Sequence, residues 1–207
     1  MGGSGQGVYA YLVPEPGGNY VNGPNGTRID LSSDAIVEKV TGSSANDTIF
    51  TGGATNTLRP GPSAGGANLQ DLGGCSPCSP AIPTSNDTYS GFAASGYGSV
   101  LIEDWGGTAD RLILPFAATD AYFEAFNYFG VDGPPHNLLI MTSSTDRITI
   151  NGQLESLDGQ DGYIEQIQFT DKTLSICATS AEAQVAALNE ASHLDAAEQE
   201  QLSQAAK

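Results

Sequence analysis

The chain has few basic residues, few histidines and few cysteines. Its 207 residues include 7 lysines and arginines against 24 aspartates and glutamates, which gives a formal net charge of −17. Such a surface repels the phosphates of nucleic acids and the head groups of anionic lipids, and it attracts cations. We therefore expect no nucleic acid partner. A second interpretation of the acidity is that it serves only to keep the surface hydrated.

Long hydrophobic runs are also missing. No apolar run reaches the roughly 18 residues that a membrane-spanning helix needs, so no transmembrane segment is expected. The start, Met1-Gly-Gly-Ser-Gly5, lacks the basic residues and the apolar stretch of a cleaved signal peptide. A cytosolic protein, a fragment of a longer chain, and export through a signal elsewhere in the chain are all consistent with this start.

Only three cysteines are present. Cys75 and Cys78 form a C-x-x-C, but their proline-rich flanks do not predict the strand and helix of a thioredoxin-like redox site. A structural zinc site would need two further ligands, and Cys177 and the two histidines are not at ligand spacing. A local disulfide or two free thiols in a loop is the favoured interpretation, ahead of metal binding and redox chemistry.

Motifs for catalysis are hard to find. The H-E-x-x-H of zinc proteases does not occur. His136 follows two prolines and His193 falls in the C-terminal tail, so neither is well placed for a Ser-His-Asp triad. Acidic residues are numerous, but no spacing singles out a glycosidase pair. We therefore expect that the chain is not an enzyme.

Glycine, in contrast, is abundant, and much of it lies in a short repeat. Residues 42–50 and 51–59 are consecutive nonapeptides in register, each with a loop of small residues, then Asp47 or Asn56, then an aliphatic residue two positions later. The nonapeptide pattern G-G-x-G-x-D-x-U-x builds a half-turn of a parallel β-roll, with a loop rich in backbone oxygens and a short strand. The repeat therefore predicts a β-roll.

The pattern weakens over about residues 60–85, where Pro, Gly, Ser and the two close cysteines indicate an insertion. It returns at Asn86-Asp87-Thr-Tyr89 and again over Gly106–Leu112, which contains Asp110. Further strands are expected at residues 8–13, 28–31, 36–40, 111–114, 137–141, 146–150 and 163–169. The aliphatic and aromatic members of the repeat should fill the interior: Ile49, Leu58, Tyr89, Ile102, Leu112 and Leu114. Trp105 is expected to pack or to cap.

These stretches resemble a known family. Residues 28–59 are similar to the entry of the repeat domain of RTX proteins, which include serralysin-type proteases and haemolysin-like toxins. Residues 86–110, 148–152 and 164–173 resemble the domain that follows the calcium-binding repeats of haemolysin-type proteins. The resemblance covers about residues 28–175 without the insertion, and it implies calcium binding and secretion through a type I exporter.

The resemblance also implies where calcium would bind. In the family, loop carbonyls and sixth-position aspartates of successive turns enclose each ion, and calcium takes 6–8 oxygen ligands. Asp47, Asp87 and Asp110 match these positions, Asn56 is a neutral substitute, and Asp104 directly precedes the Trp105-Gly-Gly loop. For each aspartate taken alone, capping of a turn is an equally good explanation.

The tail has a different composition. Thr179 and Glu182 form a capping box, and the Ala-, Glu- and Gln-rich sequence up to Lys207 has high helix propensity. A surface helix is the simplest interpretation. A segment read by a type I exporter is the alternative that the RTX resemblance implies.

The sequence therefore predicts an all-β fold: a parallel β-roll or β-solenoid of degenerate nonapeptide repeats, with a β-rich C-terminal cap and a C-terminal helix. The expected parts are a β lead-in over 1–41, the roll with its insertion over 42–114, the cap over 115–178 and a helical tail over 179–207.

The expected function is that of a non-catalytic, secreted calcium-binding module whose folding is coupled to calcium. One alternative is a metal-independent β-solenoid that acts as an adhesin or a surface-layer element. Another is an accessory C-terminal domain of a secreted hydrolase.

Overall fold

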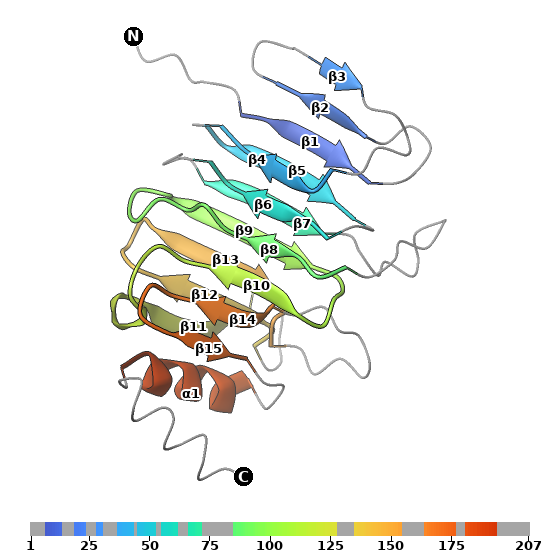
Figure 1. Ribbon diagram of the computed structural model, residues 1–207. Helices are drawn as coiled ribbons and strands as arrows, with labels where there is room; N and C mark the ends of the chain where they lie inside the picture. Colours follow the sequence, from blue (N-terminus) through green and yellow to red (C-terminus); the bar gives the residue numbers. More distant parts are fainter. Residues whose placement is uncertain are drawn as a thin grey trace.

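Two β-sheets that lie face to face and one C-terminal helix make up the protein (Figure 1). The computed structural model describes residues 7–13, 19–23, 28–30, 37–43, 45–52, 55–61, 66–71, 85–127, 135–154, 164–176 and 181–193. The pair of cysteines in the predicted insertion, Cys177, Thr179 and the tail beyond His193 lie outside the described residues.

The larger sheet, sheet A, has nine strands in the order β11 (Tyr122–Phe126), β12 (Asn137–Met141), β13 (Arg147–Asn151), β9 (Ser99–Asp104), β7 (Ala67–Asp71), β5 (Asp47–Thr51), β1 (Tyr9–Leu12), β2 (Tyr20–Asn22) and β3 (Arg28–Asp30). Sheet B has six, in the order β15 (Thr173–Ser175), β14 (Ile164–Gln168), β10 (Asp110–Ile113), β8 (Thr88–Tyr89), β6 (Thr57–Arg59) and β4 (Lys39–Thr41).

From β4 to β10 the strands belong alternately to sheet B and to sheet A, and neighbours within each sheet are parallel. The chain therefore crosses between the sheets along two opposite edges. At the A-to-B edge, sheet A strands end and sheet B strands begin, as over residues 104–110. At the B-to-A edge the direction is reversed, as over residues 41–47. Residues that end sheet A strands thus face residues that begin sheet B strands.

The predicted β-roll solenoid is wrong. The structure consists of two sheets that are largely parallel but mixed. The antiparallel pairs lie toward the sheet ends: β1 with β2, β2 with β3, β11 with β12, β12 with β13, and β14 with β15. The nine-residue period is not kept either, since β5, β6 and β7 begin ten residues apart and β9 and β10 eleven. The local strand positions that the sequence suggests for β1, β3, β4, β10, β12, β13 and β14 are confirmed to within a few residues.

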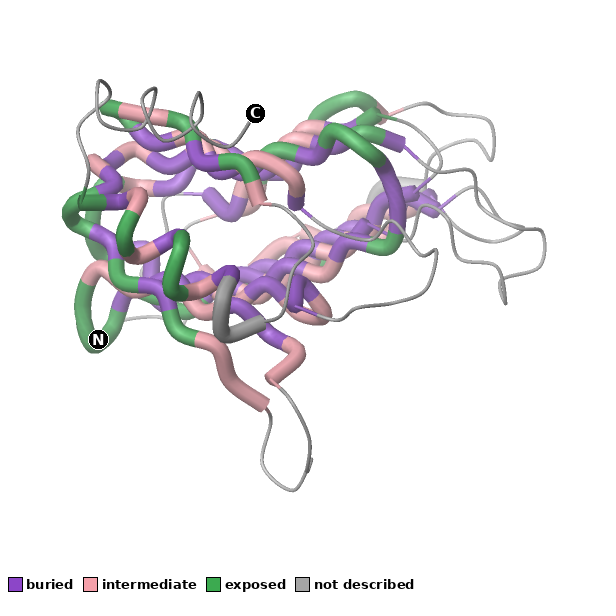
Figure 2. The backbone as a smooth tube through the Cα atoms, turned by 90° about the horizontal axis from the view of Figure 1, so that it is seen from below, coloured by how far each residue is buried: buried purple, intermediate pink, exposed green. Residues whose placement is uncertain are grey.

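The core lies between the two sheets. Burial alternates along the strands, as expected when one face of each sheet packs against the other. Figure 2 shows this two-layer arrangement from below, with buried residues along both layers. All six residues predicted to fill the interior are at most 2% exposed. Trp105 is instead 49% exposed, so its predicted packing role is wrong.

Helix α1 (Ala181–His193) lies at the end of the two sheets, next to β11 and β15 (Figure 1). Its Asn189 side chain accepts a hydrogen bond from the Phe123 N–H and donates one to the Phe123 carbonyl, and Leu188 is buried. The Lys172 ammonium donates to the carbonyls of Ala191 and Ser192, which places a positive charge at the helix C-terminus. None of the described helices has the length and hydropathy needed to span a membrane.

The stability of the two-sheet core can be tested at Leu58. Its side chain is fully buried, so Leu58→Ala leaves a cavity and should lower the free energy of unfolding by about 2–5 kcal/mol. Thr57→Ala, on the outer face of the same strand, is the control and should cost less than about 1 kcal/mol. Urea denaturation measures both, and equal costs would contradict the described inward face of β6.

Candidate metal centre

A ladder of polar side chains runs along the A-to-B edge of sheet B, where its strands begin. The Asn56 N–H donates to Asp87 Oδ1, the Asp87 N–H to Asp110 Oδ1, and the Asp110 N–H to Glu165 Oε2, each at a donor–acceptor distance of 2.5 Å. The parallel strands β6, β8, β10 and β14 place these residues at equivalent positions. Each acid therefore contacts the backbone of the preceding strand in the sheet.

Two further acids lie opposite this ladder, at the ends of sheet A strands. Asp71 ends β7 and Asp104 ends β9, and the parallel register places the two directly side by side. Only residues 105–109 separate Asp104 from Asp110, so the crossing of the chain brings the two sets of acids together. Asp71 is 0% exposed and Asp104 is 6% exposed.

Asp87, Asp104 and Asp110 together form a group that could hold a metal ion. One carboxylate oxygen from each lies within 4.8 Å of the others, and all three residues are buried. Because calcium–oxygen distances are about 2.3–2.6 Å, two ligands of one calcium ion are separated by up to about 5 Å. The spacing of the three carboxylates therefore fits a shared cation.

Two oxygens in this region lack a hydrogen-bond partner in the part of the chain that the structure describes. Asp110 Oδ2 and Asn56 Oδ1 are buried acceptors that receive no hydrogen bond. A Cβ added at Gly107, whose φ is +135°, would lie 2.0 Å from Asp110 Oδ2 and 2.4 Å from the Ser85 carbonyl oxygen. The unpaired carboxylate oxygen and a backbone carbonyl thus both lie close to Gly107, and oxygens of these two types are ligands that hard cations prefer.

Several further contacts of the three aspartates are hydrogen bonds from neutral donors. The Tyr89 hydroxyl donates to Asp104 Oδ2 at 3.0 Å, the Gly106 N–H to Asp104 Oδ1 at 3.1 Å, and the Ser85 hydroxyl to Asp87 Oδ2 at 3.0 Å. None of these bonds comes from a lysine or an arginine, so the negative charge of the group is not neutralised by them.

Burial and mutual repulsion make these acids hard to ionise. Burial raises the pKa of Asp110 to about 8, and the charges of Glu165 and Asp87 add to the effect. Burial also holds the pKa of Asp104 well above its usual value, with the charges of Asp110 and Asp71 as further causes. The pKa of Asp87 is raised by burial as well, although bonds from Asn56, Ser85 and Asp71 oppose the shift. Without a bound cation, protons must supply part of the missing positive charge.

Of the other two residues that the sequence predicts as ligands, Asp47 lies at the opposite edge and Asn56 lies beside the aspartate group. Asp47 begins β5 at the B-to-A edge, where its carboxylate accepts hydrogen bonds from the Val8 N–H, the Ser43 N–H and the Ser43 hydroxyl. These donors are typical of an aspartate that caps a turn. Asn56 belongs to the ladder next to Asp87, and its amide group donates to the Val37 carbonyl.

Sequence reasoning missed Asp71, Glu165 and Asp146. The Asp71 carboxyl hydrogen bonds to that of Asp87, and it ends the alternating segment Ala67-Asn-Leu-Gln-Asp71, which was assigned to the insertion. Asp146 precedes β13 as Asp47 begins β5, and it accepts hydrogen bonds from the N–H groups of Gly96 and Gly98. These bonds lower the pKa of Asp146, so this buried aspartate is a turn cap whose charge is stabilised by backbone donors.

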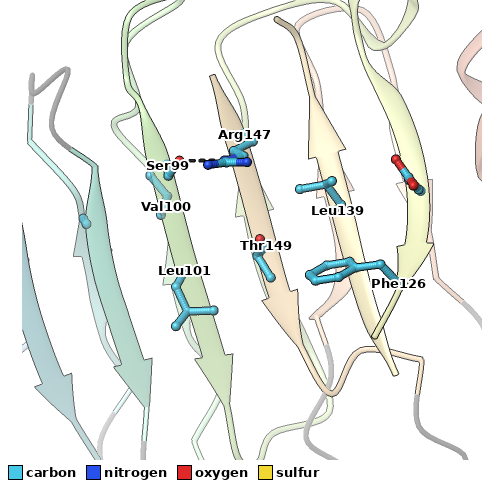
Figure 3. Close-up of a pocket in the computed structure, with 9 residues that line it drawn as sticks. Ser99, Val100, Leu101, Phe126, Leu139, Arg147 and Thr149 are labelled. Atoms are coloured by element: carbon cyan, nitrogen blue, oxygen red, sulfur yellow. Dashed lines mark hydrogen bonds between the residues drawn. The ribbon is translucent and has the colours of Figure 1, made fainter. Parts of the chain in front are cut away.

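A separate shallow groove of about 470 Å³ lies on the outer face of sheet A, over β9, β13, β12 and β11 (Figure 3). Leu101, Leu139 and Phe126 form its apolar part, and the Arg147 guanidinium donates a hydrogen bond to Ser99 at its rim. Because the groove is on the opposite side of sheet A from the core, it does not reach the aspartate group.

No protein-family model matches the chain, and no curated protein matches it significantly. The account of the centre therefore depends on its geometry.

The raised pKa values predict how stability depends on pH in the absence of metal. A buried acid with a raised pKa binds a proton more tightly in the folded than in the unfolded state, so folding is favoured most below the usual carboxyl pKa of 3.8. That contribution is lost as the pH rises toward about 8, the pKa of Asp110. In chelator, the melting temperature should fall steadily over this range.

The matched variant is Asp110→Asn, which removes one of the titrating groups and should flatten the decline. Asp146→Asn serves as the control, because the pKa of Asp146 is lowered and its loss should leave the decline in place. Parallel pH profiles for Asp110→Asn and the unmodified protein would contradict the shift assigned to Asp110.

Proposed function

We propose that the chain is a non-catalytic calcium-binding module in which one ion joins the ends of sheet A strands to the beginnings of sheet B strands. The observation that supports this most strongly is the convergence of Asp87, Asp104 and Asp110 inside the protein, where the hydrogen bonds seen within the described residues come from neutral donors. A divalent cation relieves their repulsion and satisfies the unpaired Asp110 oxygen.

The donor set favours calcium over other metals. All the donors are oxygens, whereas zinc sites in proteins usually include nitrogen or sulfur ligands. Magnesium requires a compact octahedron and keeps several waters, while calcium accepts 6–8 oxygens in irregular arrangements. Carboxylates at an irregular crossing, with the Ser85 carbonyl and Asn56 amide oxygens nearby, suit the larger ion.

Calcium binding in this arrangement is coupled to folding. Asp71 and Asp87 approach one another only when β7 and β8 are in place, and Asp104 and Asp110 only when β9 and β10 are. The unfolded chain has no such cluster, so binding energy contributes directly to the stability of the folded state. This coupling suits a secreted protein that folds outside the cell, where calcium is abundant, and the RTX resemblance supports a type I exporter as its route.

A metal-independent structural role is the second candidate, because the ladder is hydrogen bonded without an ion. Asp87 and Asp110 each accept a backbone N–H bond, and the carboxyl groups of Asp71 and Asp87 bond to each other, which requires a shared proton. In this role the protein would be a permanently folded β-structure, such as an adhesin or a surface-layer element.

Calorimetric titration with calcium separates the two candidates. Protein stripped with chelator should bind calcium with a measurable heat, and its melting temperature should rise by several degrees at saturating calcium. Magnesium at the same concentration should have a much smaller effect. Absence of heat and an unchanged melting temperature would favour the metal-independent role.

The residues are tested by the sign of their effects. Asp104→Asn removes a buried carboxyl group whose raised pKa costs stability at pH 8, so in chelator at this pH it should leave the protein as stable as the unmodified chain or more stable. In calcium it should be less stable, because a ligand is missing. Asp47→Asn should lower stability by about 1–3 kcal/mol in both conditions without shifting the calcium affinity. A lower calcium affinity in Asp47→Asn would indicate that calcium binds at the B-to-A edge instead.

Trp105 offers a local optical probe. It is the single tryptophan of the chain and is 49% exposed. It lies between Asp104 and Gly106 in the sequence, and the Gly106 N–H donates a hydrogen bond to the Asp104 carboxylate. Binding at Asp104 should alter the Trp105 fluorescence spectrum with the same midpoint as the calorimetric titration. Far-UV circular dichroism of the same samples would show whether the change is local or reports folding of the whole domain.

A further inference from the structure

The outer face of sheet B differs in charge from the rest of the protein. Lys39, Arg59 and Arg111 all point outward from it, and they are three of only seven lysines and arginines in the chain. The described outward strand residues around them are uncharged: Thr41, Thr57, Thr88, Ile113, Gln166, Gln168, Thr173 and Ser175. A patch of positive charge on a protein of net charge −17 indicates a specific use.

The nearest acids are not directed into this face. Glu165 is the extra residue of a β-bulge between β10 and β14, and its carboxylate accepts the Asp110 N–H. Glu38 is exposed and directly precedes β4. Its carbonyl accepts the Thr57 N–H, so Glu38 lies beside Asn56, at the same level of sheet B as the ladder of polar side chains. The outward rows themselves therefore keep a positive charge.

Arg59 is the best-defined cation of the face. It lies opposite Thr41 on β4, and Ser90, which follows β8, flanks it on the other side, since the Ser90 N–H continues the ladder to the Leu58 carbonyl. Its aliphatic stem lies against Gly91, where an added Cβ would be 2.9 Å from the Arg59 Cδ. Gly91 has a φ of +77°, so a glycine is favoured at the point where the stem needs space.

The Arg59 Nε is buried and donates no hydrogen bond within the described residues. The guanidinium carries further N–H donors on its two Nη atoms, and such donors form charge-assisted bonds with oxyanions. Lys39 is diagonal to Arg59 on the adjacent strand, at a separation of about 7–8 Å that long side chains can bridge. Two cations and two hydroxyl-bearing residues, Thr41 and Ser90, thus occupy neighbouring positions on this face.

We propose that this face binds a sulfated polysaccharide, with Arg59 and Lys39 holding one sulfate group and Arg111 engaging the chain farther along. A sulfate has several oxygen acceptors, which match the guanidinium, ammonium and hydroxyl donors of the cluster. The threonine and glutamine side chains around it can bond to sugar hydroxyls. Nucleic acid fits less well, because the described outward residues of this face include no aromatic side chain on which a base could stack.

Binding of short dextran sulfate chains, measured by calorimetry with calcium present, tests the proposal. The protein should bind dextran sulfate but not dextran, with an affinity that decreases as salt is added. Arg59→Thr should weaken binding about tenfold or more, and Lys39→Thr should weaken it by a smaller factor. Arg147→Thr is the matched control, because it removes the same charge from the outer face of sheet A and should leave the affinity unchanged.

Arg59→Lys provides a second variant that keeps the charge but lacks the planar guanidinium and its several donors, and it should still bind several-fold more weakly. Unchanged affinity in both Arg59 variants, with circular dichroism showing that they are folded, would overturn the proposal. An equal loss of dextran sulfate affinity in Arg147→Thr would show that the effect comes from the overall charge of the protein. Equally tight binding of a single-stranded oligonucleotide would contradict selectivity for a glycan. Each of these outcomes would remove sulfated polysaccharide as the assigned ligand.

Discussion

The confinement of several carboxylates between two packed sheets is the constraint on which this structure depends. Asp71, Asp87, Asp104 and Asp110 are all almost completely buried, and the charges of neighbouring acids add to the effect of burial in raising the pKa values of Asp104 and Asp110. Because the repulsion between like charges grows as water is excluded, the fold needs protons or a cation at this edge. The hydrophobic core brings the sheets together, and the protons or cation bound by the acids contribute to the stability of the contact between the sheets.

The way the chain alternates between the sheets explains why the acids gather. Parallel neighbours in each sheet place equivalent residues side by side, so polar residues at the beginnings of successive sheet B strands form a hydrogen-bonded ladder. The short crossing from Asp104 to Asp110 then closes the distance between the sheets. At the other edge the same type of residue has a different role, because Asp47 and Asp146 accept hydrogen bonds from backbone N–H groups. These bonds lower the pKa of Asp146.

Local patterns in the sequence predicted strands, inward residues and three of the clustered aspartates, but not the arrangement of the whole. Alternation identifies Ile49 and Leu58 as core residues because burial of one strand face has a period of two. The nonapeptide interpretation failed because two adjoining units suggested a period that the later strands do not keep. Asp71 was missed because its pairing with Asp104 depends on register between strands that are far apart in sequence. No local signal distinguishes Asp47, a turn cap, from Asp110, a buried acid with an unpaired oxygen.

A crystal structure of the protein grown in calcium would locate the ion. A bound calcium should give one strong density peak at about 2.3–2.6 Å from carboxylate oxygens of Asp87, Asp104 and Asp110, with an anomalous signal consistent with calcium. A peak beside Asp47 instead, or an ion-free cluster whose aspartates are paired through protons in saturating calcium, would contradict the proposed site.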